Sequence, residues 1–450
     1  MDQTPLTSTD VASQNIDPRL IRMFQKPEGQ VGVQGTFTHF VQPLRPPTAD
    51  DTDYVMELPN TGSDYIDLKN MQLYVRGSLK RATGVELIVD EPVLLANNAL
   101  HSLFESVTVF VGHNQQEIQM NNYPYKAYLR LLMTMKSSSP SSIGHGFVVE
   151  NRNVAKGAMG SGLARKGWTE LSKVFELLGP TFIDFFQTEG YLLPATPVRV
   201  VFRRSRDSLY VNTGADNAET QFKFFIEKIG LYVPVVKIAP FLTPLMEMQT
   251  DEAPASYHFE AIDVRQFSLP KGTLHRVYPR VFQGKLPTKM AVAFYTQDSF
   301  IGDRNQPSLM TATIFPKRLQ LAINGMVTRE HSIDVTDGTF MESYFRFTDW
   351  LGVTNIDYPI SFKSYPKSSM FLTFDLMENC VANVSDGSLS CGAESLLTGF
   401  ADIAVEFDDA VDEESIMVVY ALSPDVVDIS KERAARFTRV ITWSGVTVLL

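Results

Sequence analysis

The stretch Asn97–Met135, NNALHSLFESVTVFVGHNQQEIQMNNYPYKAYLRLLMTM, predicts a lead-in, a tight β-hairpin and a short helix in succession. The run SVTVFV at 106–111 has the β-branched and aromatic residues that favour a strand, and a polar return follows it. Between them lie Gly112 and Asn114, which adopt positive φ at low cost, as a short hairpin turn requires. The sequence therefore predicts a hairpin centred on these residues.

A helix is predicted directly after the hairpin. Pro124 suits its beginning, because a residue in the first turn needs no N–H donor. The residues that follow at helical spacing are Tyr125, Tyr128, Leu129 and Leu132. This spacing favours a helix face turned into the core, and nothing in the stretch resembles a catalytic motif.

A second version of the same pattern occurs later in the chain. VFVGHNQQEI followed by YKAYLRLL corresponds to LAINGMVTREHSI followed by MESYFRFT, with Gly112 matching Gly325 and Tyr128 matching Tyr344. Downstream, PVRVVFRR is matched with SMFLTFDL, and FKFFIEKIGLYVPVV with the late strands up to Tyr420. The shared order predicts a duplicated all-β unit, and hence two β-sandwiches side by side. The open alternative is that any two all-β domains share hairpins and strands.

Composition supports a folded, strand-rich protein. The 450 residues are 44% hydrophobic and 20% charged, and 30 Phe and 16 Tyr stand against 3 Trp, many of them in short alternating runs. The net charge of −11 argues against a protein that coats nucleic acid over its whole surface, although it permits a local basic patch. No stretch approaches the about 20 apolar residues of a membrane span, so no membrane span is expected.

The sequence contains no recognisable site for chemistry. Its seven histidines show no metal-ligand spacing with one another or with the cysteines, and phosphate-loop, dinucleotide and nucleophile-elbow motifs are absent. We therefore expect no catalytic residue, no cofactor, no metal and no enzyme activity. Cys380 and Cys391 are expected to be reduced thiols, with a single bridge as the open alternative.

Changes in local composition and apolar periodicity along the chain indicate its domain boundaries. The first 50 residues are polar and lack periodic apolar positions, and three prolines without alternation mark the stretch 237–254. The expected units are an N-terminal arm at 1–50, a first sandwich at 51–240 with an inserted loop at 136–172, a linker at 241–254, a second sandwich at 255–435 and a C-terminal tail at 436–450.

Two groups of side chains are candidates for contacts with partners. The apolar group Leu20, Ile21, Met23 and Phe24 in the arm is either a local turn or an anchor that docks on a neighbouring subunit. The basic group is Arg199, Arg203, Arg204 and Arg206. It is either a charged strand edge or subunit surface, or a patch that faces nucleic acid on the inner side of an assembly.

Several segments, taken in order, resemble one protein family. They are YIDLKN leading into LYVRG at 65–77, NNALHSLFESV at 97–107, NNYPYKAY at 121–128, LPKG at 269–272 and FQGKLP at 282–287. The series resembles the major capsid proteins of the Polinton/Maverick and adintovirus group, which belong to the adenovirus hexon-like lineage. The similarity spans roughly residues 50 to 435.

This resemblance implies an all-β fold of two consecutive eight-stranded jelly rolls with short helices in the loops. It also implies a homotrimer that forms a pseudo-hexameric capsomer and builds an icosahedral shell around double-stranded DNA. The implied partners are neighbouring capsomers, minor capsid and penton proteins and, through weak contacts, the packaged DNA. The implied location is the virion, after synthesis and assembly inside the host cell.

Two other functions remain open at the level of sequence. One is a receptor- or carbohydrate-binding jelly-roll spike, and the other is a domesticated host protein of capsid descent. If the chain is a trimer, length and polarity favour the loops 136–172, 299–312 and 378–398 as its contacts.

Overall fold

The computed structural model describes most of the chain. The described residues are 32–89, 91, 93–134, 144–146, 167–213, 221–304, 308–309, 311–312, 314–333, 340–352, 360–363, 365–368, 370–376, 381–382, 389–390, 398–437, 441–443 and 446–448. The arm residues Leu20, Ile21, Met23 and Phe24 and the two cysteines, Cys380 and Cys391, lie outside them.

The first half of the chain forms two antiparallel layers with four main strands each. One contains, in spatial order, β1 (Val33–Val41), β11 (Phe222–Ile238), β4 (Gln72–Arg81) and β8 (Phe175–Pro180). The other contains β2 (Asp53–Glu57), β9 (Val198–Arg204), β6 (Phe104–Val111) and β7 (Gln116–Met120). In this order the first strand lies beside the last, which is the strand arrangement of a jelly roll.

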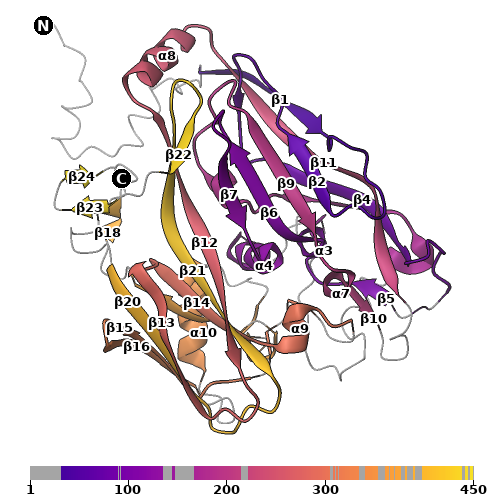
Figure 1. The fold of residues 1–450 in the computed structure, drawn as a ribbon, viewed down its shortest axis with the longest axis vertical. Helices are drawn as coiled ribbons and strands as arrows, with labels where there is room; N and C mark the ends of the chain where they lie inside the picture. The colour runs from indigo at the N-terminus through magenta and orange to yellow at the C-terminus, as the bar shows by residue number, and fades with distance from the viewer. Residues whose placement is uncertain are drawn as a thin grey trace, which may run out of the picture.

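The second half repeats this arrangement. One layer contains β12 (Ala255–Leu269), β21 (Ser415–Ile429), β14 (Lys289–Thr296) and β17 (Leu372–Asp375). The other contains β13 (His275–Lys285), β20 (Thr398–Glu406), β15 (Arg318–Ile323) and β16 (Met326–Ser332). The predicted fold class of two consecutive eight-stranded jelly rolls is confirmed, and Figure 1 shows them next to one another.

Shorter elements connect these strands. The helices are α3 (Ala99–Ser102), α4 (Tyr123–Thr134), η2 (Glu170–Ser172), η3 (Asp184–Gln187), α7 (Asp207–Tyr210), α8 (Thr243–Glu252), α9 (Gln297–Ile301), α10 (Met341–Trp350) and α11 (Tyr365–Ser368). The minor strands are β3 (Tyr65–Ile66), β5 (Val93–Leu95), β10 (Val211–Thr213), β18 (Val381–Ala382), β19 (Leu389–Ser390), β22 (Ala435–Phe437), β23 (Ile441–Trp443) and β24 (Val446–Val448).

Alternation along the strands places the core between the layers. In β9, Val198, Val200 and Phe202 are buried while the residues between them are more exposed. Successive side chains on a strand point to opposite faces of the sheet. The apolar set therefore faces the opposite layer, and the buried side chains of both jelly rolls join in one continuous hydrophobic cluster.

The two hairpin turns confirm the predicted correspondence of Gly112 with Gly325. Gly112 joins β6 to β7 with φ of 76°, and Gly325 joins β15 to β16 with φ of 81°. In the second turn Asn324 also has a positive φ, 52°, as an Asn-Gly turn requires. In the first turn the second left-handed residue is Gln115, with φ of 53°, and not the expected Asn114.

One expected match between the halves is wrong. The segment PVRVVFRR is β9, which occupies the position that β20 has in the second jelly roll, whereas SMFLTFDL contains β17, the counterpart of β8. Both segments are short apolar strands after a helix, so their sequence patterns look alike. The match of β11 with the late strand β21 is confirmed.

Three parts of the chain outside the predicted sandwiches have regular structure, and one of them is the predicted tail, which contains β23 and β24. Residues 33–41, assigned to the arm, form β1 and pair with β11 along its length. This strand escaped detection because it is an edge strand whose side chains are mostly exposed, so it lacks apolar alternation. The predicted linker contains α8, with a proline in its first turn.

Candidate functional site

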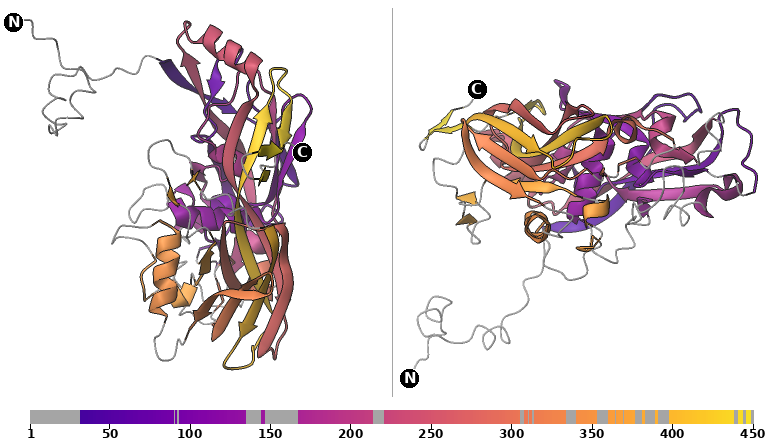
Figure 2. Two further views of the ribbon diagram at one scale, coloured as in Figure 1. Left: turned by 90° about the vertical axis from the view of Figure 1, so that its left-hand side faces the viewer. Right: turned by 90° about the horizontal axis from the view of Figure 1, so that it is seen from below.

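The helix α4 lies at the junction of the two jelly rolls (Figures 1 and 2). Every residue from Tyr123 to Leu132 is buried, including the two charged residues. Its sequence spacing favours one apolar face, but the structure covers the helix on all sides. The helix therefore contacts both jelly rolls and belongs to the core of the whole chain.

Aromatic side chains of α4 pack against residues of the second jelly roll. The ring of Tyr125 stacks on Phe300 with centroids 4.4 Å apart, and its hydroxyl donates to the Phe300 carbonyl over 2.8 Å. The same ring meets Tyr295 edge-on at 5.4 Å. Tyr128 lies 6.4 Å from Phe371, counted between ring centroids. Burial raises the pKa of Tyr125 well above its usual range, so its hydroxyl remains a donor.

A group of buried charges lies beside these rings. Asp184 of η3 is 3.6 Å from Lys126 Nζ and 3.7 Å from Arg130 Nη2, and the three side chains are at most 10% exposed. Asp184 Oδ2 also accepts a hydrogen bond from the Ile262 backbone N–H of β12 over 3.1 Å. Arg130 donates to the carboxylate of Glu260 over 3.1 Å and to the Glu260 carbonyl. These contacts join α4 and η3 to the first strand of the second jelly roll.

One feature of the sequence indicates this charge network, although no site was predicted from it. Lys126 and Arg130 stand four residues apart on an otherwise apolar helix, so they lie on the same side of it. Two cations within a buried stripe require an anionic partner nearby. The partner, Asp184, is far away in sequence and becomes visible only in the fold.

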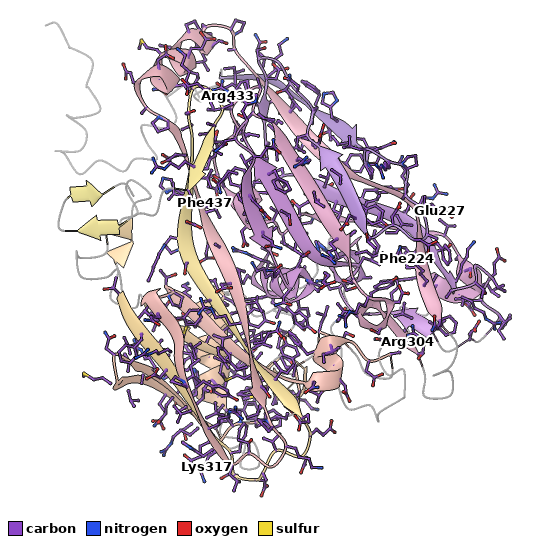
Figure 3. All side chains as sticks on the ribbon, viewed as in Figure 1. Phe224, Glu227, Arg304, Lys317, Arg433 and Phe437 are labelled. Atoms are coloured by element: carbon purple, nitrogen blue, oxygen red, sulfur yellow. The ribbon has the colours of Figure 1, made fainter. Side chains whose placement is uncertain are left out.

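The hairpin turn at Gly112 is held by the end of the second jelly roll. The side chain of Asn114 donates to the Ala435 carbonyl over 2.6 Å and accepts from the Ala435 N–H over 2.9 Å. The His113 N–H donates to the carbonyl of Arg433 over 2.9 Å, and Arg433 Nε donates to Pro194 O over 2.7 Å. Figure 3 labels Arg433 at this place. We call this contact the C-terminal clasp.

We expect G112A to loosen the C-terminal clasp. A Cβ on Gly112 would lie 2.6 Å from the Arg433 carbonyl oxygen, and the positive φ adds strain of about 1 kcal/mol. Hydrogen exchange should therefore accelerate at residues 430–437. G325A is the matched control, because its φ is also positive while its Cβ would meet nothing within 4 Å. Equal exchange of residues 430–437 in the two variants would contradict the clasp.

Buried histidines support each of the helices that follow the hairpins. His101 Nδ1 is 2.9 Å from the hydroxyl of Tyr123 in α4, and its Nε2 is 3.0 Å from His145 Nδ1. In the second jelly roll, His331 Nδ1 is 3.1 Å from Ser343 Oγ in α10, and its Nε2 is 2.8 Å from the Thr373 carbonyl. The two jelly rolls thus fix their helices by the same kind of contact.

Burial controls the ionisation of these three histidines. It lowers the pKa of His145 and of His331 to about 4, and it lowers the pKa of His101 well below its usual range, with a smaller contribution from the neighbouring His145. All three are therefore neutral at neutral pH. They act as hydrogen-bonding parts of the core.

The basic group predicted from sequence does not form one surface. Arg199 and Arg203 lie on the outer side of β9, where the Arg199 guanidinium is 4.5 Å from the centre of the Phe110 ring. Arg204 points inward, and it donates to the Tyr210 hydroxyl over 2.8 Å and to the carbonyl of Phe224. Arg206 is exposed beyond the strand. Alternation along β9 separates Arg204 from its neighbours, while a contact of the other three with a subunit or with nucleic acid stays a prediction.

The described residues show no centre for metal chemistry. Within these ranges, no three His, Cys, Asp or Glu side chains are grouped so that they could hold a metal ion. Among the helices that the structure describes, none is long and apolar enough to cross a membrane.

Known proteins resemble this chain in structure and not in sequence. No family model and no curated protein matches it. A chain of the Sputnik virophage matches with a TM-score of 0.59 and 11% identity over 96% of both chains. The faustovirus major capsid protein matches with a TM-score of 0.56 and 10% identity over 94% of both chains. The mavirus major capsid protein matches with 0.55 and 9% over 97% of this chain and 95% of that one. The chain therefore shares the double jelly-roll fold of these viral proteins.

Proposed function

We propose that the chain is a major capsid protein, a structural subunit and not an enzyme. The observation that carries the proposal is the duplication: two jelly rolls with the same strand order lie in one chain, and the helix α4, buried from Tyr123 to Leu132, packs at their junction. Three such chains around an axis provide six similar walls, which is the composition of a pseudo-hexameric capsomer. The fold neighbours named as major capsid proteins support this function.

The finer parts of the proposal rest on the sequence resemblance. We place the chain in the Polinton/Maverick–adintovirus group, in an icosahedral shell around double-stranded DNA. Its partners are two further copies in a trimer, neighbouring capsomers, and minor capsid and penton proteins, with weak contacts to packaged DNA. It would assemble inside the host cell and reside in the virion.

The junction explains how the subunit would serve as a wall. The charge network of Asp184, the rings around Tyr125 and the C-terminal clasp all join the two jelly rolls. Interlocked side chains in a close-packed core resist deformation. A fixed angle between the jelly rolls would let copies of the subunit meet in the same geometry throughout a shell.

An exposed apolar patch provides a candidate trimer contact. Ile88 and Val89 are 62% and 64% exposed, and Leu171 is 48% exposed on the segment beside them. The two segments are joined because Leu87 N–H donates to Ser172 Oγ over 2.9 Å. Leu171 and Ser172 end the inserted loop 136–172, whose length and polarity favour it for trimer contacts. Apolar surface of this kind is typical of protein interfaces.

Size-exclusion chromatography with light scattering tests the proposed function. The purified chain should elute as particles or with a mass about three times its 50.4 kDa. A stable monomer that binds a glycan would contradict the capsid proposal and favour the spike.

We expect the double variant I88D/V89D to shift the trimer to monomers, since buried charges without partners disrupt an apolar interface. The same light-scattering measurement reads the result. M326D is the matched control, because Met326 is 75% exposed at the beginning of β16 in the second jelly roll. Trimers of unchanged mass in I88D/V89D would remove this patch from the interface.

A further inference from the structure

We propose that α8 is the docking site for residues 20–24 of the same chain. The occupied surface would be the α8 face, which we define as Phe241, Leu245 and Met248. These side chains are 61%, 51% and 57% exposed. Leu245 and Met248 are three residues apart and so lie on one side of the helix, and Phe241 lies in the turn that leads into it. The contact lies within one chain, so it does not depend on the proposed capsid function.

The helix itself needs a partner. α8 has ten residues, and among the residues that the structure describes none of its side chains is buried. Isolated helices shorter than about 12–15 residues are marginal in water, because packing supplies most helical stability. An ion pair of 2.7 Å joins Asp251 to Lys431, but it is exposed and contributes little. Apolar cover on the α8 face would provide the missing stabilisation.

The chain leaves the described fold beside α8. The Ala239 N–H donates to the Gly32 carbonyl over 2.9 Å, and a Cβ on Gly32 would lie 3.4 Å from the Leu242 side chain. Figure 1 shows α8 at the edge of the molecule, beyond the strand ends and near the beginning of β1. The arm therefore enters the fold at the first turn of α8.

The length of the connection suits this site. The eight residue steps from Phe24 to Gly32 span at most about 26–29 Å when extended. A helix of the length of α8 is about 15 Å long. The apolar group of the arm thus reaches any part of the α8 face. A connection this short also keeps the local concentration of the arm high, which favours the same chain over a second copy.

Charge complements the apolar contact. The segment 19–26, RLIRMFQK, has basic side chains and no acidic ones. The α8 sequence TPLMEMQTDE has acidic side chains and no basic ones. The basic residues are Arg19, Arg22 and Lys26, and the acidic residues are Glu247, Asp251 and Glu252. Oppositely charged groups around an apolar centre give the contact its specificity.

Photo-crosslinking in the full-length protein tests the site directly. Benzoylphenylalanine at position 245 should form adducts that mass spectrometry maps to residues 19–26. The matched control carries the same group at the exposed position 326, which should give no adduct with this segment. Adducts of position 245 that avoid residues 19–26 would overturn the proposal.

A mixture of isotope-labelled and unlabelled chains identifies the source of the arm. Docking within one chain gives adducts of two light or two heavy peptides, whereas mixed adducts mean that the arm belongs to a second copy and overturn the assignment to the same chain.

Hydrogen exchange gives an independent measurement. A truncation that removes residues 1–28, and so leaves β1 intact, should accelerate exchange of residues 243–252 by on the order of tenfold. The point variant I21D/F24D should do the same in the full-length chain, and T7A/T9A in the polar part of the arm should not. Unchanged exchange of α8 in both the truncation and I21D/F24D would overturn the proposal.

Discussion

Replacing Asp184 by alanine is expected to lower the free energy of unfolding by about 3–5 kcal/mol, since it leaves the buried Lys126 without its anion and leaves Arg130 with Glu260 alone. Lys126 and Arg130 have side-chain exposures of 8% and 10%, so water does not replace the lost carboxylate. The Ile262 N–H also loses its acceptor. Equilibrium unfolding in urea, followed by tryptophan fluorescence and circular dichroism, measures the change.

Two further variants separate the causes. D263A removes an exposed carboxylate, 58% accessible and 2.8 Å from Arg265, and should cost at most about 1 kcal/mol. D184N keeps an acceptor for the Ile262 N–H but removes the charge, so it should fall between D263A and D184A. A loss in D184A no larger than that in D263A would show that the network does not stabilise the junction.

Acidification is expected to destabilise the protein between pH 6.5 and about 4, the usual pKa of histidine and the lowered pKa of His145 and His331. Because burial lowers these values, the unfolded chain binds protons in this window while the native core does not. The contribution of the neutral histidines to the free energy of unfolding is therefore fully present above pH 6.5 and is lost as the pH falls toward about 4. Each buried histidine contributes a slope of about 1.4 kcal/mol per pH unit. Urea unfolding at closely spaced pH values measures the slope.

A histidine variant isolates this effect from the titration of carboxylates. H331Q should reduce the pH dependence of the unfolding free energy by the contribution of one histidine. H258Q, at an exposed position of β12, is the matched control substitution. The H331Q protein is expected to be less stable at neutral pH, because Ser343 and Thr373 lose the imidazole. The test therefore compares how the unfolding free energy changes with pH in the two proteins, and not its value at one pH. Identical slopes in the wild type and H331Q would contradict a neutral buried imidazole.

Several features of the fold could be predicted because they depend on local pattern. Hairpins at Gly112 and Gly325 follow from residues that adopt positive φ, and the helices after them follow from apolar spacing. The order of these signals revealed the duplication. The strand β1 gave no such signal, since an edge strand with exposed side chains lacks alternation.

The candidate site was much less visible. Arg204 appears in sequence as part of a basic cluster, yet one step along β9 turns it into the core, where it contacts Tyr210 and Phe224. The partner of Lys126 and Arg130 is distant along the chain. Such pairs are selected by packing, and neither composition nor periodicity records them.

The hairpin and helix of Asn97–Met135 show the division most clearly. The sequence by itself determined the strand, the turn and the helix, because backbone preference and side-chain period act over a few residues. The tertiary structure alone decided that α4 is buried on every side and that Asn114 binds Ala435, 321 positions later. Those contacts arise when the second jelly roll packs against the first, since contacts between distant segments depend on how whole layers meet.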